Sequence, residues 1–207
     1  MLTATYTLAT LSVEQASIRM GLQTLQKYVQ VHLLQRHSTT LAQLEHAFTT
    51  LDHLYQACRW RKSEIYLIPA IRLATERADY LLAELSTLNV AVSDMLHQLR
   101  VRLDAMGANS EECVEQICGS IDVCCSTLLQ RLEKEEQELY AMARSVICGE
   151  AWFSIANEFL RHDAEKTETR RSKASVIDLP LSTANDLSSD VASNWPLHPP
   201  LKVAGGE

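Results

Sequence analysis

Polar residues interrupt four otherwise apolar helical stripes of this 207-residue sequence, namely Gln15, Arg59, Asn89, Arg131 and Glu135. Each lies near the middle of its stripe, so we expect these side chains to meet at one depth inside a helical protein. Buried polar groups cost free energy unless they are paired, and inward-facing residues of helical bundles often hold metals. Arginine repels cations, however, and amide oxygens are weak ligands. The residue types therefore favour ion pairs, unless the side chains lie at the stripe edges and reach solvent.

The elements that must position these residues are amphipathic helices with short connections. Apolar residues recur at the 3-4 spacing of one helix face over residues 11–32, 41–59, 82–103 and 114–142. Pro69 is expected to kink or end the second helix, and a short fifth helix follows Gly149. The sequence thus predicts an all-α protein, an up-down four-helix bundle with a short fifth helix.

The composition changes after residue 164, which predicts a helical bundle over 1–164 and a disordered tail over 165–207. The tail holds four of the five prolines, nine Ser or Thr and a single aromatic residue, Trp195, so it cannot bury enough apolar surface to order itself. Its apolar islands, residues 175–181 and 195–200, are either docking motifs for a protein partner or simply part of the disorder.

Charge and hydropathy exclude several classes of partner. The formal net charge of −7 argues against nucleic-acid binding, and no apolar run reaches the roughly 18 residues that span a membrane. The first residues lack the pattern of a signal peptide, so we expect a cytoplasmic protein whose six cysteines are reduced. The sequence leaves a homo-oligomer open.

Five segments carry a family resemblance through their order and spacing: residues 10–22, 58–70, 82–94, 128–140 and 149–155. The second reads Cys-Arg-Trp-Arg-Lys-Ser-Glu-Ile-Tyr-Leu-Ile-Pro-Ala, and the fourth Leu-Leu-Gln-Arg-Leu-Glu-Lys-Glu-Glu-Gln-Glu-Leu-Tyr. Together they resemble the hemerythrin-like (HHE cation-binding) domain family over about residues 8–162. The resemblance implies a di-iron site inside the bundle that serves O₂ binding, iron handling, or redox and gas sensing.

The chain departs from that family at five of the six ligand positions that can be placed. Non-ligating residues stand where the family has histidine or glutamate: Gln15, Arg59, Ser63, Asn89 and Arg131. Glu135 alone keeps a ligand type. One glutamate opposite two guanidiniums cannot hold two dications, so we predict that the di-iron centre is lost and expect no cofactor.

Ion pairs are the predicted replacement for the metal charge. Arg59 and Arg131 would pair with Glu135 and Glu64, bridged by Gln15 and Asn89. No motif arranges a nucleophile with a base, so the prediction is a non-catalytic regulatory or interaction module with a protein partner.

Two other functions are left open. The first is an iron-binding, O₂-sensing or redox-sensing protein with unusual ligands. The candidates for a relocated metal site are His32, His46, His53 and His97, with Glu45 or Asp52. The second is a thiol redox sensor that uses Cys118 and Cys125, seven residues apart on one helix face.

Overall fold

The computed structural model describes residues 2–34, 39–105 and 111–177, which are almost entirely helical and contain no strand. In chain order the elements are α1 (Leu2–Tyr28), the π-helix η1 (Val29–Leu33), α2 (Leu41–Arg59), the π-helix η2 (Ser63–Leu67), α3 (Ile68–Ala74), the 3-10 helix η3 (Glu76–Ala78), α4 (Asp79–Asp104), α5 (Glu111–Lys134), the π-helix η4 (Glu135–Leu139), α6 (Tyr140–Val146) and α7 (Gly149–Ile177). The all-α prediction is confirmed. Within these ranges no helix is long and apolar enough to cross a membrane.

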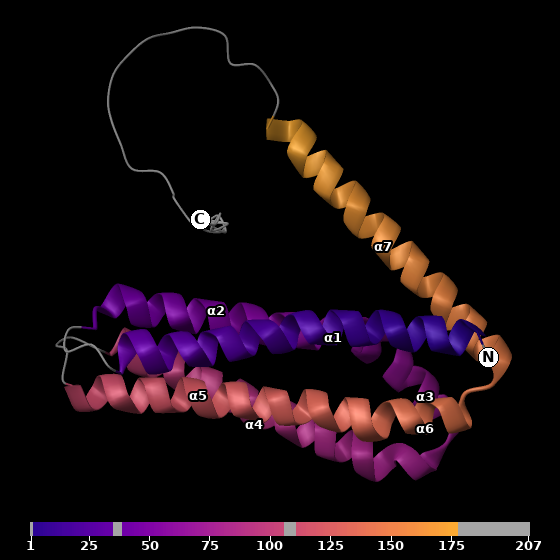
Figure 1. Ribbon diagram of the computed structural model, residues 1–207, viewed down its shortest axis with the longest axis horizontal. Coiled ribbons are helices and arrows are strands. Elements are labelled where there is room, and N and C mark those ends of the chain that lie inside the picture. Colours follow the sequence, from indigo (N-terminus) through magenta and orange to yellow (C-terminus); the bar gives the residue numbers. More distant parts are fainter. Residues whose placement is uncertain (1, 35–38, 106–110, 178–207) are drawn as a thin grey trace, which may run out of the picture. The chain divides into compact units, whose positions relative to one another are not determined.

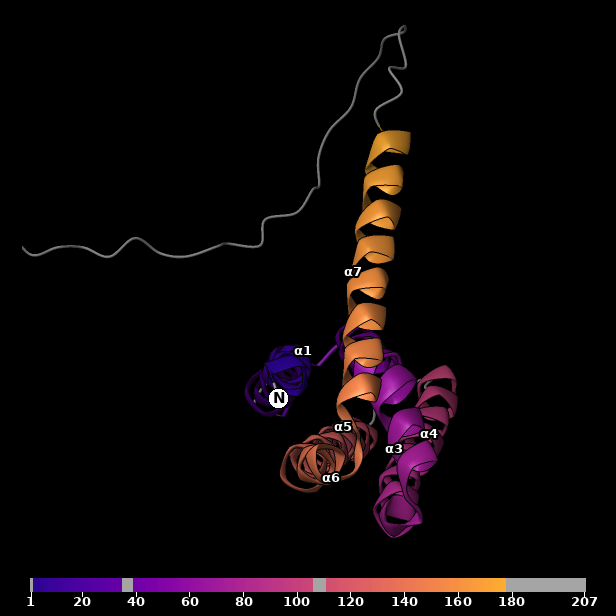
Figure 2. The same ribbon diagram turned by 90° about the vertical axis from the view of Figure 1, so that its right-hand side faces the viewer.

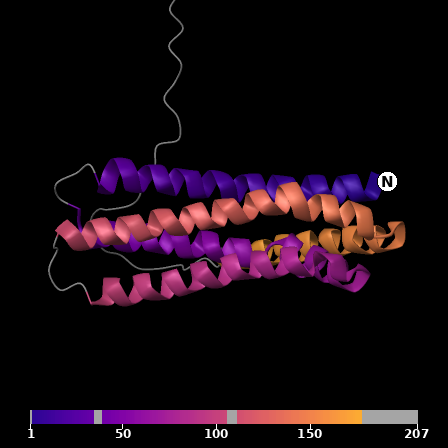
Figure 3. The ribbon, with the colours of Figure 1, turned by 90° about the horizontal axis from the view of Figure 1, so that it is seen from below.

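Helices α1, α2, α4 and α5 lie side by side along a common direction (Figures 1, 2 and 3). Helices α1 and α4 each pack against both α2 and α5. Helix α5 continues through η4 into α6 as one long rod. Contacts divide the chain into two compact units, 1–167 and 168–207. We call the described residues of the first unit the helical body.

A polar layer separates the core of the helical body into two apolar clusters. Along α1 the second cluster ends at Leu11 and the first begins at Ile18, with buried Gln15 between them. Along α4 the same change occurs between Leu85 and Val92. The first cluster draws on residues 18–132, and the second on residues 8–11, 67–85 and 139–159.

The π-helix η1 corrects the predicted inward face of the first helix. Leu33 is buried and His32 is exposed, whereas the 3-4 pattern over residues 11–32 predicts His32 on the inner face. A π turn contains one residue more than an α turn, so it moves the buried position one residue further along the chain.

The end of the second helix also differs from its prediction. Helix α2 stops at Arg59, ten residues before Pro69, and Trp60 caps it with a non-helical backbone (φ −104°, ψ 22°). Pro69 lies at the start of α3, which follows the π-helix η2 directly, so the chain stays helical through this proline. The chain therefore breaks at residues 60–62.

The prediction that the fifth helix is short is wrong, and the helix extends past residue 165, where the predicted tail begins. Helix α7 has 29 residues and continues to Ile177. Its first turns bury Trp152 and Phe159 in the second cluster, and Lys62 binds Asp163 further along at 2.7 Å. Residues 161–174 are rich in Ala, Glu, Lys and Arg, which favour a helix even without an apolar face. The remaining tail, 178–207, lies outside the described residues.

A capping box fixes the start of α2. The Thr40 hydroxyl accepts from the Gln43 backbone N–H, and the Gln43 side chain accepts from the Thr40 N–H at 2.9 Å. We expect Thr40→Ala to lower the free energy of unfolding by about 1 kcal/mol, measured by urea denaturation. Thr50→Ala, in the middle of the same helix, is the matched control and should change stability by less than about 0.5 kcal/mol. Equal losses in the two variants would contradict the capping role.

Candidate functional site

Four charged side chains meet in the polar layer, and we call Arg61, Glu64, Arg131 and Glu135 the ionic cluster. Arg61 Nη2 donates to Glu135 Oε1 at 2.7 Å, and Arg131 Nη1 lies 2.5 Å from the same oxygen. Arg131 Nη2 donates to Glu64 Oε1. Arg61, Arg131 and Glu135 are fully buried, while Glu64 is 20% exposed. Two positive and two negative charges therefore balance inside the protein.

Backbone carbonyls hold both guanidiniums in place. Arg61 comes from the turn between α2 and η2, and its Nε donates to the Cys58 carbonyl at 3.1 Å. Arg131 lies near the end of α5, and its Nε donates to the Leu85 carbonyl of α4 at 3.4 Å. Burial alone would lower the pKa of Arg61, but the charge of Glu135 and its hydrogen bond raise that pKa above its ordinary value. Arg61 is therefore charged at every physiological pH.

Gln15 and Tyr140 form a neutral branch of the polar layer. Gln15 Nε2 donates to the Leu132 carbonyl at 2.5 Å, and Gln15 Oε1 accepts from the Tyr140 hydroxyl at 3.3 Å. Burial, reinforced by the charge of Glu135, raises the pKa of Tyr140 above its ordinary value, so the phenol stays protonated. Gln15 thus links α1 to the rod formed by α5, η4 and α6.

The prediction that Arg59 lies in the interior is wrong. Its side chain is exposed and its guanidinium lies 6.0 Å from the centre of the Tyr55 ring. Arg61 takes the interior place because α2 ends at residue 59 and the following turn rotates the chain. The helical pattern itself could have indicated Arg61. Tyr55, Cys58 and Arg61 are all buried, and each follows the previous one at a spacing of three residues.

Asn89 and Ser63 lie beside the ionic cluster without joining it. Asn89 is half-buried and lines a pocket of about 300 Å³ with Arg59, Glu64 and Asp94. Within the described part of the chain, Asn89 Oδ1, Ser63 Oγ and Glu135 Oε2 are buried without a hydrogen-bond partner. The predicted bridge through Asn89 is therefore absent from those residues. Glu64 is the one predicted residue that borders both the pocket and the buried ion pairs.

The donors in this layer do not fit a di-iron centre. Glu135 Oε1 already contacts two guanidiniums, and Ser63 and Gln15 offer only weak neutral oxygens. Over the described ranges no group of three or more His, Cys, Asp or Glu side chains lies close enough together to hold a metal ion. The arrangement can pair and bury charge, but it presents no set of ligands for a dication.

Known proteins give no further guide to the site. No protein-family model, curated protein or solved structure matches this chain. In the structure, two arginines meet two carboxylates between the two apolar clusters.

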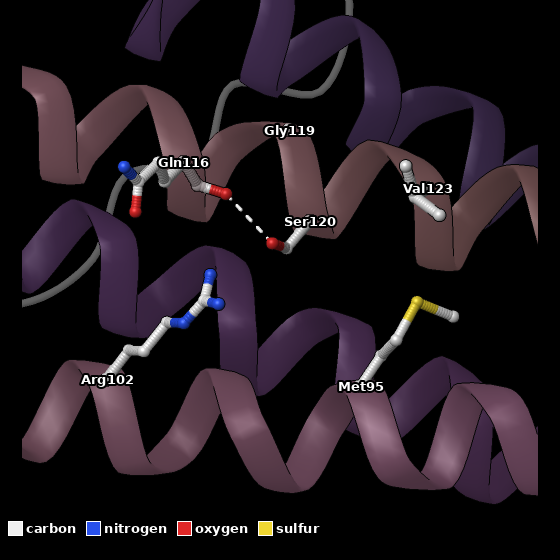
Figure 4. A pocket seen from close by; sticks show the side chains of 6 residues that line it. All are labelled: Met95, Arg102, Gln116, Gly119, Ser120 and Val123. Atoms are coloured by element: carbon white, nitrogen blue, oxygen red, sulfur yellow. Dashed lines mark hydrogen bonds between the residues drawn. The ribbon is translucent and has the colours of Figure 1, made fainter.

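A shallow pocket of about 400 Å³ lies between α4 and α5, away from the ionic cluster. Figure 4 shows Met95 and Arg102 of α4 facing Gln116, Ser120 and Val123 of α5. Arg102 is the only charged side chain among its lining residues, and the Ser120 hydroxyl donates to the Gln116 carbonyl at 2.8 Å. This pocket offers no convergent polar groups, so the ionic cluster is the stronger candidate.

The buried cysteines are poorly suited to redox sensing. Burial raises the pKa of Cys118 to about 11 and the pKa of Cys124 and Cys125 to about 12. Cys58 lies beside the ionic cluster, where burial raises its pKa to about 11 although Arg61 acts in the opposite direction. Reactive thiols need accessible thiolates, so these side chains act as small apolar core residues.

Removal of the Glu135 carboxylate should leave the buried Arg61 and Arg131 without the charge that they share. We expect Glu135→Ala to lower the free energy of unfolding by about 3–5 kcal/mol in urea denaturation. Glu136→Ala is the matched control, because Glu136 is about half exposed and pairs with Arg19 at the surface, where a pair is worth less than about 1 kcal/mol. A loss below about 1 kcal/mol for Glu135→Ala would contradict a buried ionic cluster.

The raised thiol pKa values set a direction for the pH dependence of stability. A thiol in the unfolded chain loses its proton from about pH 8.5, whereas buried Cys124 keeps it to about pH 12. The unfolded state thus binds fewer protons, and the free energy of unfolding should fall as pH rises above about 8.5. Measured by urea denaturation, the free energy of unfolding of Cys124→Ala should fall less steeply with pH than that of the unsubstituted chain. Cys148 is exposed, so Cys148→Ala should show the same fall as the unsubstituted chain. If the free energy of unfolding falls equally steeply with pH in the two variants, the Cys124 thiol is not the cause of the pH dependence.

Proposed function

We propose that this chain is a hemerythrin-like, up-down four-helix bundle in which an ionic cluster replaces the family's di-iron centre. The chain would act as a non-catalytic regulatory or interaction module. The observation that carries the proposal is that Glu135, the one residue of a ligand type, is shared by two buried guanidiniums.

Charge balance explains why such an exchange preserves the fold. A site that holds dications between carboxylates is stabilised by opposite charges in a dry interior, and two arginines supply such charges permanently. In this chain Arg61 and Arg131 offset Glu64 and Glu135 without a ligand that must be loaded. The interior would then serve stability, and any function would be performed by the surface.

The packing of α1, α2, α4 and α5 supports the bundle architecture. Each of α1 and α4 lies against α2 and α5, as alternate members of a four-helix arrangement do. The surface partner would be a protein, with the C-terminal residues beyond Ile177 as one candidate segment for contact.

Metal content tests the proposal directly. Protein purified after anaerobic iron loading should hold less than about 0.1 iron, manganese or zinc per chain, and a chelator should leave its midpoint of thermal unfolding unchanged. About two irons per chain, with a lower unfolding midpoint after chelation, would overturn the proposal and favour an iron-binding or O₂-sensing protein. Glu135→Gln separates the cases further, because a metal site would lose its iron while the metal-free chain would only lose stability.

A further inference from the structure

Helix α1 carries a second apolar stripe, on the face opposite to the core. Its members are all exposed: Leu2, Tyr6, Ala9, Val13, Ala16 and Met20. They follow one another at spacings of 4, 3, 4, 3 and 4 residues, the a and d positions of a heptad repeat. Leu2 is 90% exposed, Val13 72% and Met20 66%. We call these six residues the outer stripe.

The outer stripe is open and almost free of charge. Helix α1 lies along one edge of the helical body, with α2 and α5 against its inner face (Figure 3). Residues 2–13 contain no charged side chain. The two charged residues that follow are engaged within the chain, since Glu14 accepts from the Lys62 backbone N–H and Arg19 pairs with Glu136. A contiguous apolar surface of this kind on a protein marks an interaction site.

We propose that the outer stripe is the interface of a homodimer in which α1 packs antiparallel against α1 of a second copy. The residue numbers support this pairing, because a two-fold axis at residue 11 places each a position opposite a d position. Leu2 then faces Met20 of the other copy, Tyr6 faces Ala16, and Ala9 faces Val13. The largest side chain of the stripe thus meets one of the smallest, as interdigitated packing requires.

The apolar area of the outer stripe is large enough for a specific homodimer interface. The exposed fractions of the stripe correspond to roughly 500 Å² of apolar surface per copy, or about 1,000 Å² when both copies are counted, which is the lower limit for a biological interface. Interfaces at this lower limit belong to weak or transient complexes, so we expect a dimer that dissociates on dilution.

A membrane surface is the less favoured occupant. Helices that lie on membranes carry many Lys and Arg beside the apolar face, but α1 has only Arg19 and Lys27 in a chain of net charge −7.

The dimer is also independent of the proposed function, because the outer stripe lies on the opposite face of α1 from the polar layer. Failure of one proposal leaves the other intact.

Sedimentation of the full chain between about 1 and 100 µM tests the dimer. The expected mass is about 46 kDa, twice the 23.2 kDa of one chain. Val13→Glu would place two carboxylates near the two-fold axis and should weaken the dimer by at least about tenfold. Val101→Glu is the matched control, because Val101 is 54% exposed on α4, diagonal to α1, and its substitution should leave the dimer unchanged. Circular dichroism of both variants checks that they are folded.

A charge exchange tests the antiparallel direction. Ala9→Glu combined with Val13→Lys sets opposite charges against each other in the antiparallel pair and should dimerise at least about tenfold more tightly than Val13→Lys alone. In a parallel pair of α1 helices, like charges would meet. If the double variant dimerises no more tightly than Val13→Lys alone, the antiparallel geometry is therefore wrong. A chain that stays monomeric at 100 µM, whether or not it floats with anionic vesicles, would overturn the dimer itself, as would a dimer unaffected by Val13→Glu.

Discussion

The carboxylate oxygen Oε1 of Glu135 contacts two buried guanidiniums, and the packing on both sides of the polar layer depends on this shared contact. Burial of each charge is expensive, and the opposite charge beside it offsets that cost only while the geometry is kept. Apolar packing above and below the layer is non-directional, whereas charged hydrogen bonds have a fixed length and direction. We infer that Glu135 sets the register in which α5 meets Arg61 and the turn after α2.

Of the three π-helices in the described residues, two begin in the polar layer, η2 at Ser63 and η4 at Glu135. The wider turn adds a residue to each helix at the level where charged side chains replace apolar ones. Beyond it the inward positions are occupied by Leu67 in one element and by Leu139 in the other. The π turns thus let one chain bury ion pairs at one depth and still present an apolar face at the next.

The sequence predicts the helices well, because their apolar residues repeat over several turns, and Leu22 and Ile121 are fully buried as the stripes require. It places Arg131 and Glu135 correctly in the interior for the same reason. The choice of Arg59 over Arg61 fails at the end of α2, because Arg59 continues the stripe at a spacing of four from Tyr55, whereas the buried residues continue at a spacing of three through Cys58 to Arg61. The sequence predicts too short an α7 because residues 161–174 are rich in Ala, Glu, Lys and Arg, which favour a helix without the apolar periodicity on which the prediction depends.

The division of the core into two clusters also has a consequence for the order in which the protein is made. Every residue of the first cluster lies between Ile18 and Leu132, so that cluster can be completed before the rest of the chain has been synthesised. The second cluster joins Leu8 to Phe159, near opposite ends of the helical body's sequence. During synthesis from the N-terminus, the first cluster can therefore form early. Leu8 stays without its complete set of packing partners until α7 has been synthesised.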